Sequence, residues 1–256
     1  MKNLYGLLGY PLGHSFSRTF FNNKFARERI DAEYLNFELP SIETFLQLIA
    51  DYPNLHGLNV TIPYKQAVIP YLDELSDEAR AIGAVNVVKI VRSDKRTILT
   101  GYNSDIIGFT DSIRPLLQPH HKKALVLGTG GASKAICRGL ERLGLKWHYV
   151  SRRPALTGGD EGRAFSYSDI TPALLADYTV IVNCTPLGMY PKIDAAPTIP
   201  YAALSPRHLL YDLVYNPELT LFMREGRRFG ATVKNGLEML HLQAMASWKF
   251  WNEQDL

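Results

Sequence analysis

Apolar and polar positions follow two different rhythms along the chain. Runs of β-branched and other apolar residues predict strands, and apolar residues recurring every three or four positions predict helices. The predicted strands are Leu4–Gly9, Tyr34–Leu39, Leu58–Ile62, Ala84–Val91, Thr97–Tyr102, Ala124–Leu127, Trp147–Val150, Val180–Val182 and Leu209–Leu213. The predicted helices are Phe16–Ile30, one capped by Ser41, Leu72–Ile82, one carrying Ile136 and Leu140, and Leu237–Trp251. This alternation predicts an α/β fold.

The pattern changes after Tyr102, where a loop-prone connection precedes a fully apolar strand at Ala124–Leu127. That strand runs directly into glycines and then a helix. We place the main domain boundary near Asp105–Phe109 and predict two α/β domains.

Composition and charge exclude several classes of function. Of the 256 residues, 46% are hydrophobic and 21% are charged, as in folded globular proteins. A net charge of +3, spread along the chain, suits a small anionic ligand better than nucleic acid. We see no apolar run long enough for a membrane span and no secretory signal. Two cysteines, Cys137 and Cys184, cannot build a disulfide framework or a cysteine-rich zinc site, so we expect a protein of the reducing cytoplasm and no metal.

The glycine-rich turn resembles a dinucleotide-binding motif. Gly128 allows a tight turn, and Gly130 and Gly131 let backbone N–H groups approach a pyrophosphate at the helix start, near Ala132. Ser133 stands where a third glycine or alanine is usual. The alternative is a purely structural strand-to-helix turn.

The end of the next strand indicates which dinucleotide binds. A carboxylate there would bind the ribose of NAD, but the residues are Ser151, Arg152 and Arg153. Because guanidinium groups bind phosphate oxygens in a fork, NADP is favoured over NAD. The alternative is an ordinary solvated arginine pair.

Polar residues that follow two front-half strands are candidates for proton transfer. Lys65 follows one strand and Asp105 follows another. Such a pair can exchange a hydroxyl proton during hydride transfer. Taken alone, Lys65 also fits a surface lysine and Asp105 a helix cap.

Eight segments together resemble the shikimate dehydrogenase family, and they occur in family order across nearly the whole chain. They are Gly9–Ser17, Asn59–Lys65, Gly83–Asn86, Gly101–Asp105, Gly128–Ala132, Asn183–Met189, Tyr211–Pro217 and Asn235–Leu240. The resemblance implies NADP-dependent reduction of 3-dehydroshikimate to shikimate, in aromatic amino acid biosynthesis.

The resemblance also implies roles for individual residues. Lys65 and Asp105 match the family's catalytic pair. Contacts to the substrate carboxylate or hydroxyls are implied for Ser15, Ser17, Thr61, Asn86, Tyr215 and Gln243. NADP contacts are implied for Gly128, Gly130, Gly131, Ala132, Ser151, Arg152, Arg153, Thr185, Leu213, Gly236 and Met239.

The sequence departs from the family pattern at three places. Ser151–Arg153 reads Ser-Arg-Arg where Asn-Arg-Thr is common, Leu213 stands where methionine is frequent, and Glu238 replaces a usual glycine. None of these departures falls on Lys65 or Asp105.

The resemblance implies a substrate-binding domain over 1–105, an NADP-binding Rossmann domain over 106–236, and a helix over 237–256 that returns to the first domain. The expected partners are small molecules, with the chain acting as a monomer or homodimer. The alternatives are a quinate or dual quinate/shikimate dehydrogenase, a methylenetetrahydrofolate dehydrogenase, and a non-catalytic NADP-sensing module. Ser17 and the acid-free arginine segment argue against a quinate enzyme.

Overall fold

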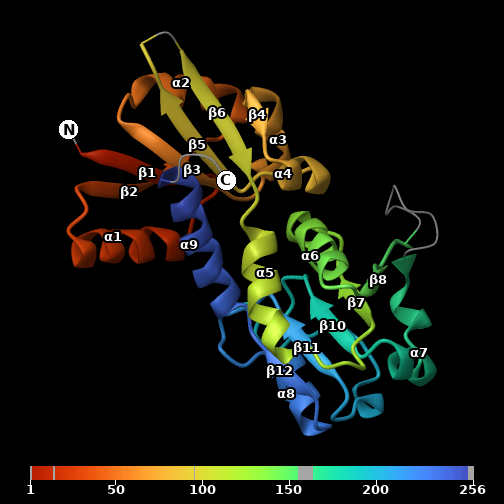
Figure 1. Ribbon diagram of the computed structural model, residues 1–256. Helices are drawn as coiled ribbons and strands as arrows, with labels where there is room; N and C mark the ends of the chain where they lie inside the picture. Colours follow the sequence, from red (N-terminus) through yellow and green to blue (C-terminus); the bar gives the residue numbers. More distant parts are fainter. Residues whose placement is uncertain (1, 14, 95, 155–163, 253–256) are drawn as a thin grey trace. The chain divides into compact units, whose positions relative to one another are not determined.

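The chain folds into two compact units. The computed structural model describes residues 2–13, 15–94, 96–154 and 164–252, so His14 of the Gly9–Ser17 motif lies outside the described residues. The first unit comprises Met1–Ser104 with Gln243–Leu256, and the second comprises Asp105–Leu242. Figure 1 labels the elements of both units.

A mixed six-stranded sheet organises the first unit, in the order β2-β1-β3-β5-β6-β4. β1 is parallel to β2 and β3, whereas β5 is antiparallel to both β3 and β6. The carboxyl ends of β1, β3 and β6 therefore share one edge of the sheet with the amino end of β5. The strands are β1 (Asn3–Gly9), β2 (Ala32–Glu38), β3 (Leu55–Val60), β4 (Glu74–Leu75), β5 (Val87–Arg92) and β6 (Thr97–Tyr102).

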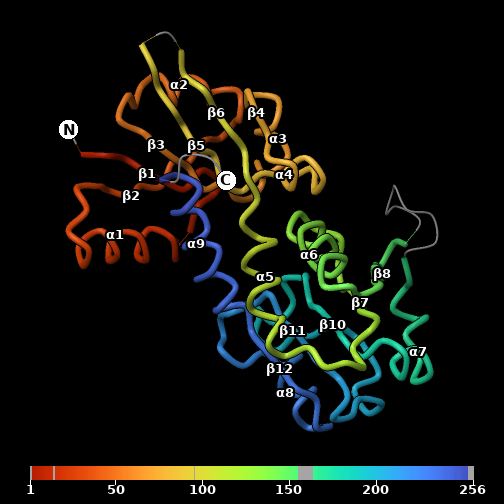
Figure 2. The backbone as a smooth tube through the Cα atoms, in the orientation of Figure 1, coloured from red at the N-terminus to blue at the C-terminus, as the bar shows by residue number. Residues whose placement is uncertain are grey.

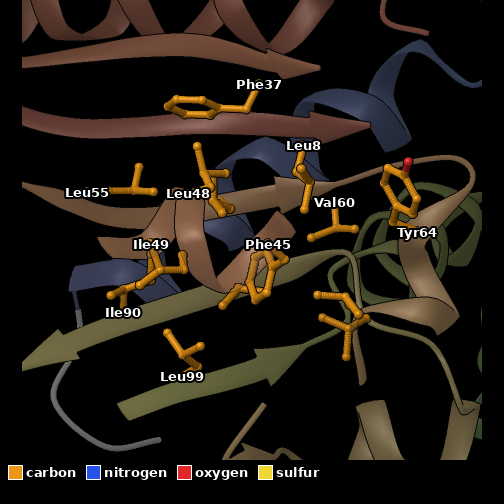
Figure 3. Close-up of a cluster of buried hydrophobic side chains, with 14 of the residues drawn as sticks. Leu8, Phe37, Phe45, Leu48, Ile49, Leu55, Val60, Tyr64, Ile90 and Leu99 are labelled. Carbon is orange, nitrogen blue, oxygen red and sulfur yellow. The ribbon is translucent and has the colours of Figure 1, made fainter. Parts of the chain in front are cut away.

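Both faces of this sheet are covered, because successive side chains point to opposite faces. Leu4 and Leu8 of β1 enter one cluster, and Tyr5 enters the other. Figure 3 shows the first cluster, in which side chains from the strands meet those of α2. The helices of this unit are α1 (Phe16–Glu28), α2 (Phe45–Asp51), α3 (Tyr64–Ala67) and α4 (Asp77–Ile82).

The second unit contains a fully parallel sheet in the order β12-β11-β10-β7-β8-β9. Read from β9, this is the 3-2-1-4-5-6 order of a Rossmann fold, whose switch point lies between β7 and β10. Its strands are β7 (Lys123–Leu127), β8 (Lys146–Val150), β9 (Ala164–Phe165), β10 (Val180–Asn183), β11 (Leu209–Asp212) and β12 (Thr232–Lys234).

Helices cover both faces of the parallel sheet. Ala124 and Val126 of β7 pack with α5 (Asp105–Ile113) and α6 (Gly131–Arg142). Leu125 and Leu127 pack with α7 (Pro172–Asp177) and α8 (Leu221–Arg228). The predicted α/β fold with a Rossmann domain is confirmed.

The last helix, α9 (Leu237–Asn252), begins in the second unit and ends in the first. Its final turns pack beside α1, as Figures 1 and 2 show. The Trp251 ring lies 4.9 Å from Tyr5 and 5.2 Å from Phe21, between ring centroids. The predicted packing of the C-terminal helix on the first domain is therefore confirmed.

The predicted helix Leu72–Ile82 is wrong over its first half. Glu74–Leu75 forms β4 and pairs with Thr100–Gly101 of β6. Asp73 accepts a hydrogen bond from the Leu99 N–H group at 2.7 Å, and Ser76 caps the helix that begins at Asp77. Leu72 and Leu75 have helical spacing, but the available sheet edge decides the local structure.

The connection before β7 contains two adjacent histidines, and the structure fixes the tautomer of His121. The Gln118 N–H group donates to Nδ1 of His121 at 2.9 Å, so the proton is on Nε2, which lies 3.1 Å from the Arg207 carbonyl oxygen. Burial is the main cause that lowers the pKa of His121 below its usual value.

His121 therefore makes the folded state sensitive to acid. As the pH falls below about 6.5, the unfolded chain takes up a proton on His121 before the folded chain does, so this contribution to stability decreases until folded His121 is protonated as well. Replacing His121 with Gln is expected to flatten the dependence of unfolding free energy on pH between about pH 5 and pH 7. The change is at most about 1.4 kcal/mol per pH unit. Urea unfolding of both proteins across that range measures it, and equal slopes would contradict it.

Candidate functional site

One edge of the first unit's sheet collects most of the predicted substrate residues. Ser15 and Ser17 follow β1, Thr61 follows β3, and Asn86 precedes β5. The N–H group of Thr61 donates to the Leu8 carbonyl oxygen at 2.9 Å, which ties the ends of β1 and β3 together. The topology thus places hydroxyl and amide side chains from three separate segments at the same end of the sheet.

The two serines lie at the start of α1. Ser15 is its N-cap and accepts a hydrogen bond from the Arg18 N–H group at 3.1 Å. Because the Ser15 oxygen accepts this bond, its proton is available to donate to an anion. Ser17 lies in the first turn and is half-buried.

Asn86 is held in one orientation by Ser104. Its Oδ1 accepts a hydrogen bond from the Ser104 N–H group at 2.7 Å, and its Nδ2 donates to the Ser104 hydroxyl at 3.1 Å. The Asn86 side-chain amide has a second N–H bond beyond the one given to Ser104. Asn86 can therefore offer one donor of fixed direction to a hydroxyl-bearing ligand.

Lys65 lies in α3, one short turn after Thr61. The Tyr64 N–H group donates to the Thr61 carbonyl oxygen at 2.8 Å, and the Val85 N–H group donates to the Lys65 carbonyl oxygen at 2.7 Å. These bonds fix the Lys65 backbone beside Asn86, and its side chain is half-buried. Gln243, also half-buried, lies on the α9 segment that belongs to this unit.

The second unit contains a cavity of about 660 Å³ at the carboxyl ends of β7, β8 and β10. This volume is in the range of small-molecule sites, and the position is the switch point where Rossmann folds bind nucleotides. Its walls are formed by Gly128, Thr129, Gly130, Val150, Ser151, Arg152, Tyr167, Cys184, Thr185, Pro186, Leu187 and Thr198.

The glycine turn has the backbone geometry that the motif predicts. Gly128 has a φ of 96°, and a Cβ atom there would lie 2.9 Å from Cγ2 of Thr185. Gly130 is the N-cap of α6, and Gly131 and Ala132 form its first turn. Ser133 is fully buried, and its hydroxyl donates a hydrogen bond to the Gly130 carbonyl oxygen at 2.6 Å. This bond accounts for a serine in place of the third glycine.

The two predicted arginines lie in different surroundings. Arg152 lines the cavity, whereas Arg153 is exposed and is not among the described residues of its wall. Ser151 accepts a hydrogen bond from the Arg153 N–H group at 3.2 Å. Burial raises the pKa of Tyr167, and the nearby positive charge of Arg152 lowers it in part. Tyr167 is a site residue that the sequence analysis missed, because no motif marks it.

Thr185 is held by a buried polar relay. Its N–H and hydroxyl groups both donate to Oδ1 of Asn183, at 3.0 and 2.7 Å. Asn183 in turn donates to Asp212 at 2.9 Å. Burial raises the pKa of Asp212 to about 6, against hydrogen bonds from Thr220, Val214 and Asn183 that lower it.

The remaining predicted cofactor residues lie around the start of α9. A Cβ atom at Gly236 would lie 2.2 Å from the Leu213 carbonyl oxygen, so only glycine fits there without a shift. Met239 is buried in the core of this unit. Glu238 forms an ion pair with Lys234, which offsets the negative charge that replaces the usual glycine.

Asp105 and Tyr215 belong to the second unit. Asp105 is the first residue of α5 and is only 3% exposed, whereas Tyr215 is 40% exposed.

Over the described residues, we find no group of three His, Cys, Asp or Glu side chains arranged to hold a metal ion. No helix in the described ranges is both long and apolar enough to cross a bilayer.

The two sites fit two different ligands. The first unit offers short hydroxyl and amide groups, which suit a small polyhydroxylated acid. In the second unit, the glycine turn, the helix N-terminus and Arg152 fit the phosphates of a dinucleotide.

Comparison with known proteins agrees with this division. Residues 7–88 match the family model of the shikimate dehydrogenase substrate binding domain. A shikimate dehydrogenase (NADP(+)) of Caldicellulosiruptor saccharolyticus is 36% identical over 98% of this chain and 92% of its own length. A chorismate mutase/shikimate 5-dehydrogenase fusion protein of Clostridium acetobutylicum has a TM-score of 0.86 at 35% identity, covering 100% of this chain and 93% of its own. The shikimate 5-dehydrogenase of Thermus thermophilus, solved with NADP(H) and shikimate, has a TM-score of 0.83 at 30% identity, covering 98% and 94%.

Proposed function

The chain belongs to the shikimate dehydrogenase family, and we propose that it catalyses the reversible NADPH-dependent reduction of 3-dehydroshikimate to shikimate, in aromatic amino acid biosynthesis. The observation that carries this proposal is the gathering of hydroxyl and amide side chains at one sheet edge. Shikimate has one carboxylate and several hydroxyls, and such groups are recognised by short donors and acceptors. In this proposal the first domain, predicted over 1–105, binds substrate and the second, predicted over 106–236, binds NADP, and the compact units themselves divide between Ser104 and Asp105.

The residues divide the work as follows. Ser15 and Ser17 bind the carboxylate, and Thr61, Asn86, Tyr215 and Gln243 complete the contacts to substrate. NADP supplies or accepts the hydride when it is bound. Lys65 and Asp105 move the hydroxyl proton, which must leave as shikimate is oxidised.

Steady-state assays of the purified chain test the proposal. We expect NADP reduction with shikimate, much slower reduction with quinate, and weaker use of NAD than of NADP. Faster turnover of quinate than of shikimate would instead favour the quinate enzyme. Binding of NADP without turnover of either acid would favour the non-catalytic module.

Arg152 is expected to provide most of the preference for NADP. Arg152→Gln should raise the KM for NADP by about 10- to 100-fold, the effect of losing hydrogen bonds between charged groups, and leave the KM for NAD nearly unchanged. Arg153→Gln is the matched comparison, because Arg153 is exposed and is not among the described residues of the cavity wall. Titrating both cofactors against each variant measures the effect, and equal losses in the two variants would contradict the assignment.

The proposal also places the enzyme in the cytoplasm, acting as a monomer or homodimer. Cys137 and Cys184 are both free thiols, as is usual in a reducing compartment. Sedimentation of the purified chain over a range of concentrations tests the oligomeric state.

A further inference from the structure

A row of buried polar side chains runs beneath the substrate edge of the first unit. The Tyr34 hydroxyl donates to Oδ1 of Asn59 at 2.8 Å, and Nδ2 of Asn59 donates to the Ser247 hydroxyl at 2.8 Å. The Ser247 hydroxyl oxygen lies 3.4 Å from that of Ser104. Tyr34, Ser104 and Ser247 are all 0% exposed.

Each end of this row contacts a residue that we assign to substrate binding. At one end, Ser104 holds both polar atoms of the Asn86 side-chain amide. At the other, burial raises the pKa of Tyr34, and hydrogen bonding with the Ser17 side chain lowers it in part. The row therefore connects the predicted carboxylate contact with a predicted hydroxyl contact.

The row also joins the C-terminal helix to the sheet. The Ser247 hydroxyl donates to the Gln243 carbonyl oxygen at 2.9 Å, one helical turn earlier. Asn59 is on β3 and Ser247 is on α9, so their hydrogen bond ties this segment of α9 to the strand. Because Gln243 is one helical turn before Ser247, the same bond helps to hold Gln243 in place.

Packing alone does not require these polar groups. Tyr34 stacks on Phe21, with ring centroids 4.8 Å apart, inside an aromatic cluster that a phenylalanine would fill as well. Buried polar groups are costly unless every one is paired, and fully paired networks specify one arrangement. Burying this row of polar groups costs free energy, and both of its ends contact residues assigned to substrate binding. The orientation that the row imposes on those two residues best explains why it is present.

We propose that Tyr34 and Ser247 are positioning residues, which act through Asn59 and Ser104 to set the orientations of Ser17 and Asn86 for substrate. This inference rests on the proposed function, since it assigns the supports of the same site.

The test uses Tyr34→Phe, Ser247→Ala and the double variant in the full chain. Tyr211→Phe is the matched control, because Tyr211 is equally buried and shares a 2.6 Å hydrogen bond with Ser112 in the second unit. We expect each single variant to raise the KM for shikimate roughly threefold to tenfold, the usual effect of one lost hydrogen bond, with the KM for NADP unchanged. The double variant should raise it by less than the product, because both changes release Asn59.

The control separates positioning from stability. Tyr211→Phe should lower the melting temperature about as much as Tyr34→Phe and leave the KM for shikimate unchanged. Folded Tyr34→Phe and Ser247→Ala variants with wild-type KM for shikimate would overturn the inference, as would an equal rise in Tyr211→Phe. A wild-type chain that fails to oxidise shikimate would overturn the proposed function instead. Shikimate-induced shifts in melting temperature provide a second readout that does not depend on turnover.

Discussion

Lys65→Met is expected to lower kcat for shikimate oxidation by about 10²- to 10⁴-fold, the usual contribution of general acid–base catalysis. Methionine keeps most of the lysine stem but cannot carry a proton. Asp105→Asn keeps the shape and a hydrogen bond and should cause a loss of the same order. The double variant should lose much less than the product of the two, because removing one member already disables a coupled pair.

Steady-state kinetics on the three variants measures this, with circular dichroism to confirm folding. Lys89→Met and Asp111→Asn are controls of the same chemical kind, since Lys89 lies on β5 and Asp111 lies on α5 away from its first turn. Both should keep kcat near the wild-type value. A folded Lys65→Met variant with wild-type kcat would assign proton transfer elsewhere, and a change confined to KM would indicate binding rather than chemistry.

Trp251→Ala is expected to destabilise the first unit by about 3–5 kcal/mol, the usual cost of truncating a buried tryptophan. The Trp251 indole N–H donates to the Val88 carbonyl oxygen at 3.1 Å, and its ring fills the space above Gly57, where a Cβ atom would lie 2.4 Å away. Losing these contacts releases the end of α9, which carries Gln243 and Ser247. The KM for shikimate should therefore rise together with the loss of stability.

Denaturant unfolding and kinetics on the same samples measure both effects. Trp251→Phe should restore most of the ring packing and much of the stability. Trp147→Ala removes an equally large side chain, 9% exposed, from the second unit, and should destabilise without raising the KM for shikimate. If Trp147→Ala and Trp251→Ala raise that KM equally, α9 has no special role in substrate binding.

Local patterns were enough to predict most of the elements. Each predicted strand is present, because alternating or fully apolar runs such as Ala124–Leu127 leave few other ways to bury their side chains. The turn at Gly128 was also predictable, since glycines between a strand and a helix have few other uses. In the substrate site, local patterns indicated only Lys65 and Asp105. The other assignments there depended on the family resemblance.

Elements whose form depends on a distant partner were not predictable. Leu72–Ile82 has helical spacing, yet β4 forms there because the edge of β6 offers hydrogen bonds to Glu74–Leu75. The short strand β12 was missed for the same reason, because Thr232–Lys234 gains its form by pairing with β11.

By itself, the sequence determined the fold class, the glycine turn and, through its motifs, the family. Only the tertiary structure decided that Arg152 rather than Arg153 lines the cavity, and that Tyr167 joins it. It alone placed Ser247 against Asn59, 188 positions earlier in the chain. The physical reason is range: propensity and periodicity act over a few residues, whereas these contacts exist only after strand order and helix packing have brought distant segments together.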